Sequence, residues 1–116
     1  MINQNLTELN KLEEWINNFV KDHTEYTYER HDRESSFVPN WHQIVVYNKY
    51  HKVFDAVCHF GSYGYSQGLL EIMGDIVTES EDKVVGWLTS QDVIDRFVGW
   101  IGDTKDEIDR YRYIYK

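Results

Sequence analysis

The segment HFGSYGYSQGLLEIMG occupies residues 59–74 and holds four of the seven glycines of the chain. An apolar run lies on each side of it, which is typical of two strands joined by a turn. Glycine adopts positive φ without steric cost, so these residues predict a tight β-hairpin loop. The segment contains neither the Walker pattern nor GxGxxG, and it leads into a strand instead of a helix. A hairpin is therefore favoured over a phosphate-binding loop.

The strand before this loop is predicted to pair with an earlier one. The β-branched and aromatic side chains of residues 41–47 predict a strand. Residues 48–51 are predicted to form a turn, and residues 52–60 the strand that runs back beside the first. A four-residue turn would place Trp41 opposite Cys58. Because side chains alternate along a strand, a shift of one residue would exchange the two faces of this pair.

The predicted pairing places His42, Asp55 and His59 on one face of the sheet. Two imidazoles and a carboxylate are suitable ligands for a divalent metal and suitable groups for acid–base chemistry. One hypothesis is therefore a small-molecule or metal-binding protein that uses this face. The simpler interpretation is a set of solvated polar residues on a half-exposed antiparallel sheet.

Helices are predicted at both ends of the chain. Leu6, Leu9, Leu12 and Ile16 recur at helical spacing, which predicts a helix over residues 6–21 with Asn5 as its N-cap. Near the other end, Thr89 and Asp92 form a capping box before an apolar stripe. We expect Gly102 to end that helix and residues 104–107 to begin a short last one.

Together these patterns predict an α+β fold. It has an N-terminal helix, a three- to four-stranded antiparallel meander sheet and two C-terminal helices packed on one face of the sheet. Residues 24–31 alternate as a half-exposed strand, and Pro39 belongs at an edge or a strand entrance. A length of 116 residues suits a single α+β domain over residues 1–116.

The charge of the chain is unevenly distributed. Its net charge is −8, and residues 71–109 hold eleven acidic residues against three basic ones. An acidic surface repels nucleic acid and anionic membrane, so a partner with a basic surface is favoured over either. The single cysteine, Cys58, fits a reducing compartment, and no signal peptide or transmembrane run is visible. These features predict a cytoplasmic protein.

Three motifs resemble small uncharacterised proteins encoded by phages and prophages of Gram-positive bacteria. They are residues 61–64 (GSYG), residues 68–74 (GLLEIMG), and residues 86–89 (GWLT) followed by Asp92-Val93. The resemblance covers roughly residues 41–98 and carries no assigned active residues. It implies an accessory protein working in an infected bacterial cell, where such proteins often inhibit host enzymes or defence systems, as anti-CRISPR proteins do.

The leading hypothesis is a non-enzymatic protein that binds and inhibits a host protein through an acidic surface bearing aromatic residues. The partner would have a basic surface, as a nucleic-acid-binding effector has, and no cofactor or catalytic residue is expected. Tyr63 and Tyr65 at the loop tip are the predicted anchors. A homodimer that buries exposed aromatic side chains is a further alternative. The acidic residues predicted to contact the partner are Glu79, Glu81, Asp82, Asp103, Asp106 and Glu107.

Overall fold

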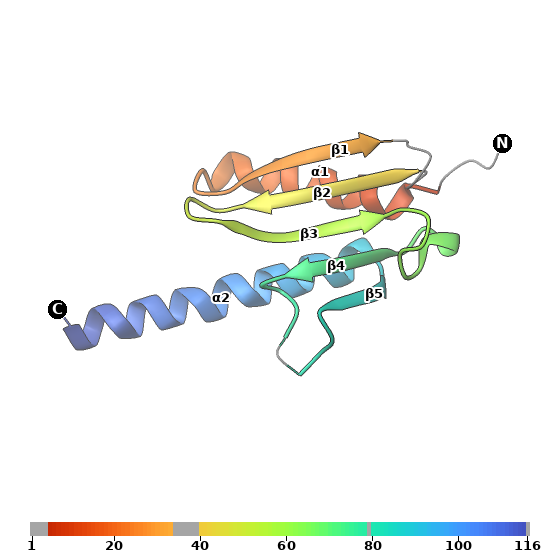
Figure 1. Ribbon diagram of the computed structural model, residues 1–116. Coiled ribbons are helices and arrows are strands. Elements are labelled where there is room, and N and C mark those ends of the chain that lie inside the picture. The colour runs from red at the N-terminus through yellow and green to blue at the C-terminus, as the bar shows by residue number, and fades with distance from the viewer. Residues whose placement is uncertain (1–4, 34–39, 79, 116) are drawn as a thin grey trace.

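The computed structural model describes residues 5–33, 40–78 and 80–115, with side chains described as far as Thr104. It confirms an α+β fold that begins and ends with a helix (Figure 1). No helix within these ranges is long and apolar enough to cross a membrane. In chain order the elements are α1 (Thr7–Asp22), β1 (Thr27–Arg33), β2 (Trp41–Tyr47), β3 (Lys52–Cys58), a 3₁₀ turn (Tyr65–Gln67), β4 (Leu70–Gly74), β5 (Val84–Leu88) and α2 (Ser90–Tyr115).

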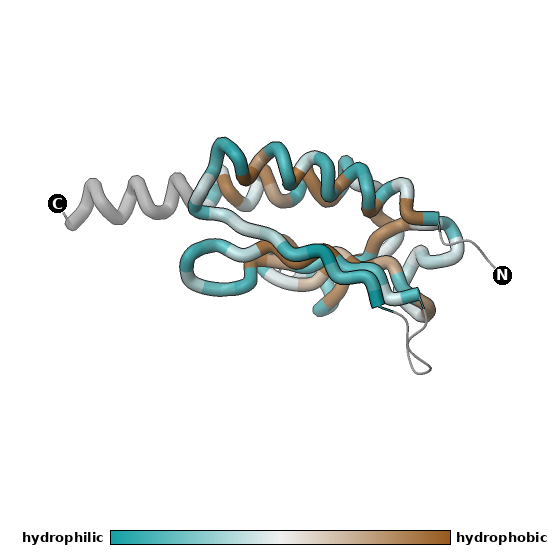
Figure 2. Tube along the Cα trace, turned by 90° about the horizontal axis from the view of Figure 1, so that it is seen from above, coloured by the Kyte–Doolittle hydropathy of each residue, from teal (hydrophilic) through white to brown (hydrophobic). Residues whose placement is uncertain are grey.

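The sheet has five strands in the order β1-β2-β3-β4-β5, and each neighbouring pair is antiparallel. It is the predicted meander with one strand more than expected. The additional strand, β5, is short, contains Gly86 and runs directly into the capping box of α2, so its period-two pattern is weak. Both helices lie over the same face of the sheet, and the other face has no helix on it (Figure 2).

The core lies between this face and the two helices, and Phe97 of α2 is at its centre. Phe97 is 1% exposed. Its ring lies 5.3 Å from that of Phe19 in α1, 5.5 Å from that of Tyr26 and 5.1 Å from that of Phe54 in β3, measured between centroids. Aromatic pairs at such distances stabilise beyond the area that they bury. One aromatic cluster therefore joins both helices to the sheet.

The register of β2 and β3 differs by one residue from the predicted pairing, so the prediction was wrong here. His42, and not Trp41, lies opposite Cys58, and Ile44 lies opposite Ala56. A bulge between Val46 and Tyr47 absorbs the extra residue next to the turn. The physical reason is burial, because this register points Ile44 and its neighbours Val46, Phe54 and Ala56 toward the helices, where each is 0% exposed.

The two predicted C-terminal helices are one continuous helix, α2, so the predicted break was also wrong. A glycine ends a helix when it adopts the left-handed conformation. Gly102 is not among the glycines with positive φ, and the helix continues through it. One prediction for the first helix was also wrong, because Leu6 and not Asn5 occupies its N-cap position; Asn5 Oδ1 accepts a hydrogen bond from the Thr7 nitrogen at 3.1 Å. The predicted first helix is α1, and the capping box is formed, with Asp92 Oδ2 3.0 Å from the Thr89 nitrogen and Thr89 Oγ1 3.2 Å from the Asp92 nitrogen.

The glycine-rich segment connects the antiparallel strands β3 and β4 as predicted, but it does so over residues 59–69 and through the 3₁₀ turn, so it is not the tight hairpin loop that was predicted. Gly64 and Gly68 have φ values of 95° and 70°, which are costly for other residues. A Cβ atom on Gly64 would lie 3.2 Å from the backbone of Trp87, so the loop also packs closely against β5. These glycines therefore serve both the turn and its packing.

Candidate protein-binding site

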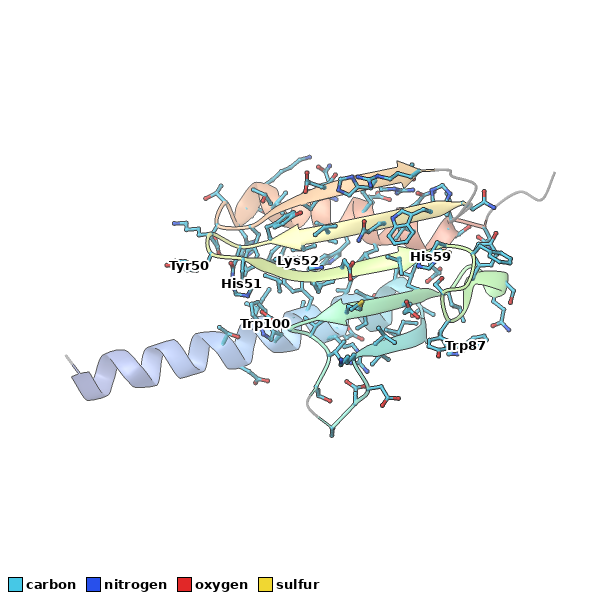
Figure 3. All side chains as sticks on the ribbon, viewed as in Figure 1. Tyr50, His51, Lys52, His59, Trp87 and Trp100 are labelled. Carbon is cyan, nitrogen blue, oxygen red and sulfur yellow. The ribbon has the colours of Figure 1, made fainter. Side chains whose placement is uncertain are left out.

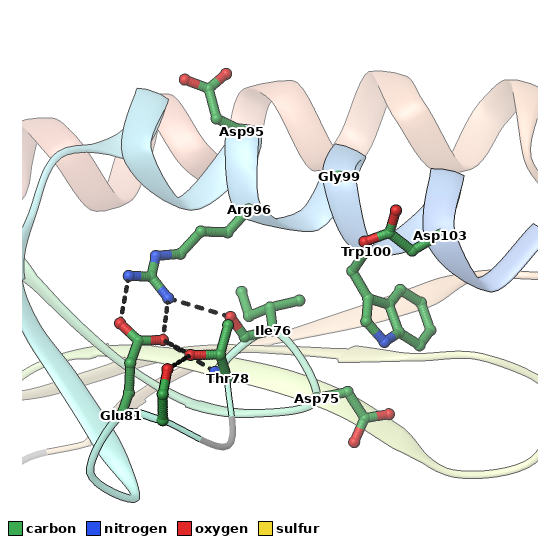
Figure 4. A pocket seen from close by; sticks show the side chains of 10 residues that line it. Asp75, Ile76, Thr78, Glu81, Asp95, Arg96, Gly99, Trp100 and Asp103 are labelled. Atoms are coloured by element: carbon green, nitrogen blue, oxygen red, sulfur yellow. Dashed lines mark hydrogen bonds and ion pairs between the residues drawn. The ribbon is translucent and has the colours of Figure 1, made fainter.

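An open groove of about 520 Å³ lies between α2 and the connection from β4 to β5 (Figure 4). Asp95, Gly99 and Asp103 come from successive turns of one side of α2, because a spacing of four residues returns to the same helix face. Asp75 and Glu81 come from the connection on the other side. The groove therefore brings together acidic residues from two separate parts of the chain.

An ion pair between Arg96 and Glu81 holds the two walls together. The two terminal guanidinium nitrogens of Arg96 donate to the two carboxylate oxygens of Glu81 at 2.9 and 2.7 Å. Arg96 also donates to the backbone oxygen of Ile76 at 3.2 Å. Such two-pronged pairs are stronger and more directional than single hydrogen bonds. The connection is thereby fastened to α2.

Glu81 has further donors on its own side of the groove. The backbone nitrogen and the hydroxyl group of Thr78 each donate to Glu81 Oε1 at 2.9 Å. The hydrogen bonds from Arg96, followed by those from Thr78, lower the pKa of Glu81 from 4.5 to about 2. The same contact with Glu81 raises the pKa of Arg96. Both groups are therefore fully charged at neutral pH, and each neutralises the other.

The other three carboxylates of the groove have no arginine or lysine partner, and Asp75 alone contacts a histidine. Asp95 accepts a hydrogen bond from Gln91 at 2.8 Å, and Asp75 Oδ2 lies 2.7 Å from His51 Nε2. Within the side chains that the structure describes, no Lys or Arg nitrogen lies within 4.0 Å of Asp75, Asp95 or Asp103. Their charges add to one negative potential in the groove. The groove is therefore suited to a cation.

Trp100 supplies an aromatic surface to the same groove. Its indole is half-buried and stacks on Phe97 with centroids 6.3 Å apart and planes 17° from parallel. Figure 4 shows the ring between Asp103 and Asp75. Gly99, one residue earlier, has open space where a side chain would begin. A positively charged group can therefore approach the indole and the carboxylates together.

Only some of the acidic residues that were predicted to contact a partner lie at this groove. Glu81 and Asp103 line it, and Asp82 is exposed in the same connection. Glu79 lies outside the described residues, as do the side chains of Asp106 and Glu107, whose backbone belongs to α2.

Sequence reasoning missed the other charged and aromatic residues that line the groove, Asp75, Asp95, Arg96 and Trp100. The spacing of Asp95 and Asp103 was a usable signal, but the predicted break at Gly102 separated them.

The predicted tyrosine anchors lie at a different end of the molecule. Tyr63 is 56% exposed, whereas Tyr65 is half-buried and its hydroxyl group accepts a hydrogen bond from Asn40 at 3.1 Å. Both follow the end of β3, and the Tyr63 carbonyl oxygen accepts a hydrogen bond from the Trp87 nitrogen at 3.3 Å, whereas the groove lies near His51, before the start of β3 (Figure 3). The acidic residues of the groove and these tyrosines therefore do not form one surface.

The three residues of the predicted metal-binding face are separated by the register of the sheet. The ring of His59 stacks on that of Trp41 at 4.4 Å, and Asp55 accepts a hydrogen bond from Gln43 at 2.7 Å, both on the face without helices. His42 lies on the helix-covered face, where its Nδ1 is 2.6 Å from Asp32 Oδ1. Among the described residues, no group of three His, Cys, Asp or Glu side chains is placed to hold a metal ion.

None of the protein-family models, curated proteins or solved structures compared with this chain matches it.

Proposed function

We propose that this protein is a non-enzymatic binding protein whose groove takes a basic side chain from a partner protein. One observation carries the proposal: the indole of Trp100 and the carboxylates of Asp75, Asp95 and Asp103 border the same space of about 520 Å³. A guanidinium group can stack on an indole while its nitrogens donate to carboxylates in the same plane. Arginine matches both features of the groove.

The Arg96–Glu81 pair gives this groove a defined shape before any partner arrives. Because Arg96 is held by Glu81 and by the Ile76 carbonyl, it does not neutralise the aspartates on the same helix face. A groove that is already formed loses less conformational entropy on binding. The internal ion pair therefore supports the function without taking part in the contact.

The sign of the charge defines the class of partner. A phosphate-rich ligand would be repelled by Asp95 and Asp103, which have no Lys, Arg or His nitrogen within 4.0 Å among the described side chains, whereas a surface that binds nucleic acid is rich in Arg and Lys. The resemblance to phage-encoded proteins supports a bacterial host protein as the partner. By occupying its basic surface, the protein would inhibit such an effector.

A peptide-binding experiment tests the groove directly. An arginine-rich peptide, titrated by calorimetry at low and high salt, should bind with a salt-dependent affinity, and a peptide of equal length with serine replacing arginine should not bind. Trp100→Leu should weaken binding about tenfold, since it removes the stacking surface. Asp103→Asn should weaken binding less than this.

The matched control is Glu14→Gln, which removes one negative charge from the exposed side of α1. It should leave the affinity within about twofold, because Glu14 does not line the groove and salt screens charges that do not contact the ligand. Equal loss of affinity in Glu14→Gln and Asp103→Asn would show that only net charge matters. Unchanged affinity in Trp100→Leu would disprove the groove as the binding site.

A further inference from the structure

The first strand of the sheet has an open outer edge. In the sheet order, β1 is hydrogen-bonded to β2 alone, so no other strand of the described residues lies beside its outward backbone groups. The pairing with β2 is regular over all seven residues of β1, from Thr27 to Arg33. An unbroken edge strand without proline or a bulge is a template for another strand.

The opposite edge is different. β5 is five residues long, its pairing with β4 shifts register between Leu70 and Ile72, and Trp87 at that point has a φ of 62°. Short length and a bulge are two of the features by which proteins prevent an edge from pairing. Edge-to-edge association is therefore open to β1 and hindered at β5.

The charges along β1 are complementary to the same strand in the opposite direction. Residues 29–33 read Glu-Arg-His-Asp-Arg. Antiparallel pairing of two such strands about His31 places each Glu29 opposite an Arg33 and each Arg30 opposite an Asp32. Opposite charges on facing residues stabilise a strand pair, and like charges destabilise it. We infer that β1 binds the β1 of a second copy in this register and forms a homodimer.

The side chains are oriented as this pairing requires. Antiparallel pairing about a residue places Glu29 and Arg33 on one face and Arg30 and Asp32 on the other, in both copies. Within one copy, Arg30 already donates to Glu13 of α1 and to Asp32, each at 3.1 Å, on the helix-covered face. The second copy thus extends an existing charged network and adds a new pair on the open face.

Neighbouring registers are less favourable by charge. Pairing about Arg30 would place the two Arg30 side chains opposite each other, and pairing about Asp32 would do the same for two carboxylates. Each of these creates a like-charge pair at the centre of the contact. When the two strands pair about His31, both acidic side chains of β1, Glu29 and Asp32, face a basic side chain of the second copy.

Charge reversal tests this register. Sedimentation equilibrium should show a dimer for the unmodified chain. Glu29→Arg or Arg33→Glu places like charges at two positions of each dimer, and each change should weaken association about tenfold. The double variant Glu29→Arg/Arg33→Glu should recover the affinity of the unmodified chain. A mixture of the two single variants should form a heterodimer, because each then faces its opposite charge.

Two controls change the net charge by the same amount away from β1. Asp82→Arg and Lys83→Glu lie on the β4–β5 connection and should leave association unchanged. Amide hydrogen exchange of the unmodified chain should show protection of β1 that increases with protein concentration. A monomer at every concentration, a dimer unaffected by both single reversals, or a double variant that stays weak would each overturn the proposal.

Discussion

At the scale of single residues, Glu81 is the group on which the groove depends most. It accepts hydrogen bonds from Arg96 on α2 and from Thr78 on its own segment. All of these donors favour the ionised carboxylate over the protonated one. Protonation of this one side chain should therefore loosen the wall of the groove.

The pH dependence of stability tests this role of Glu81. Its pKa is about 2 in the folded protein and 4.5 without these contacts. A lowered pKa contributes stability that is complete above pH 4.5 and is lost as the pH falls through about 2. We expect the difference in unfolding free energy between the unmodified protein and Glu81→Gln to shrink across this range, measured by urea denaturation.

The unmodified protein and the variant are compared at the same pH. The difference between their unfolding free energies therefore excludes the contribution of other carboxylates, such as Glu8, whose pKa is also lowered. Asp82→Asn, next along the chain and exposed, is the control and should change the unfolding free energy by less than Glu81→Gln does at neutral pH. A difference for Glu81→Gln that stays constant from pH 7 to pH 2 would contradict the assignment.

At the scale of elements, the decisive feature is the continuity of α2 past Gly102. Without it, Asp95 and Asp103 would not share one helix face, and the groove would lack a wall. Glycine inside a helix costs backbone entropy without breaking the helix, unless its conformation becomes left-handed. The sequence pattern alone does not distinguish these two outcomes.

Replacing glycines with alanine distinguishes a helical glycine from a turn glycine. In Gly102→Ala the added Cβ atom would have no atom of another residue within 4 Å, so the change should raise the unfolding free energy by about 0.5–1 kcal/mol. Gly74→Ala should lower it by more than this, because Gly74 has a φ of 116° and a Cβ atom there would lie 2.5 Å from the Val53 carbonyl oxygen. Urea denaturation measures both.

A loss of stability in Gly102→Ala would show that α2 ends at that residue. A neutral effect of Gly74→Ala would show that the end of β4 adopts a different backbone.

At the scale of the whole molecule, the two helices are linked by a contact that spans most of the chain. Glu8 of α1 accepts hydrogen bonds from the backbone nitrogen and the hydroxyl group of Ser90 at 2.8 and 3.2 Å. The hydrogen bond from the Ser90 nitrogen is the largest influence that lowers the pKa of Glu8. A carboxylate of the first helix thereby satisfies a free N–H group at the start of the last one.

Removing the Glu8 carboxylate should lower the unfolding free energy by more than is usual for a partly exposed side chain. Glu8→Ala is expected to lower the unfolding free energy by about 1 kcal/mol, since it leaves a helix N-terminus without one of its acceptors. Glu14→Ala, an exposed substitution of the same kind on α1, should change it by less than about 0.5 kcal/mol. Thermal or urea denaturation of the two variants measures the difference. Equal effects would show that the contact with Ser90 adds nothing.

Local patterns were sufficient for much of the fold. The apolar stripe of α1, the capping box of α2 and the glycines that join β3 to β4 each act over a few residues, and each is found where it was predicted. These signals depend on helix period, end groups and backbone conformation, which neighbouring residues determine.

Tertiary packing determined the rest. The bulge next to Tyr47 moves His42 away from Asp55 and His59, because burial of apolar side chains under the helices outweighs the simplest turn geometry. The groove exists only because Arg96 meets Glu81, 15 residues apart, and because α2 continues past Gly102. The spacing of neighbouring residues does not determine which distant segments come into contact, or which apolar side chains are buried in the core. Only the folded chain shows these.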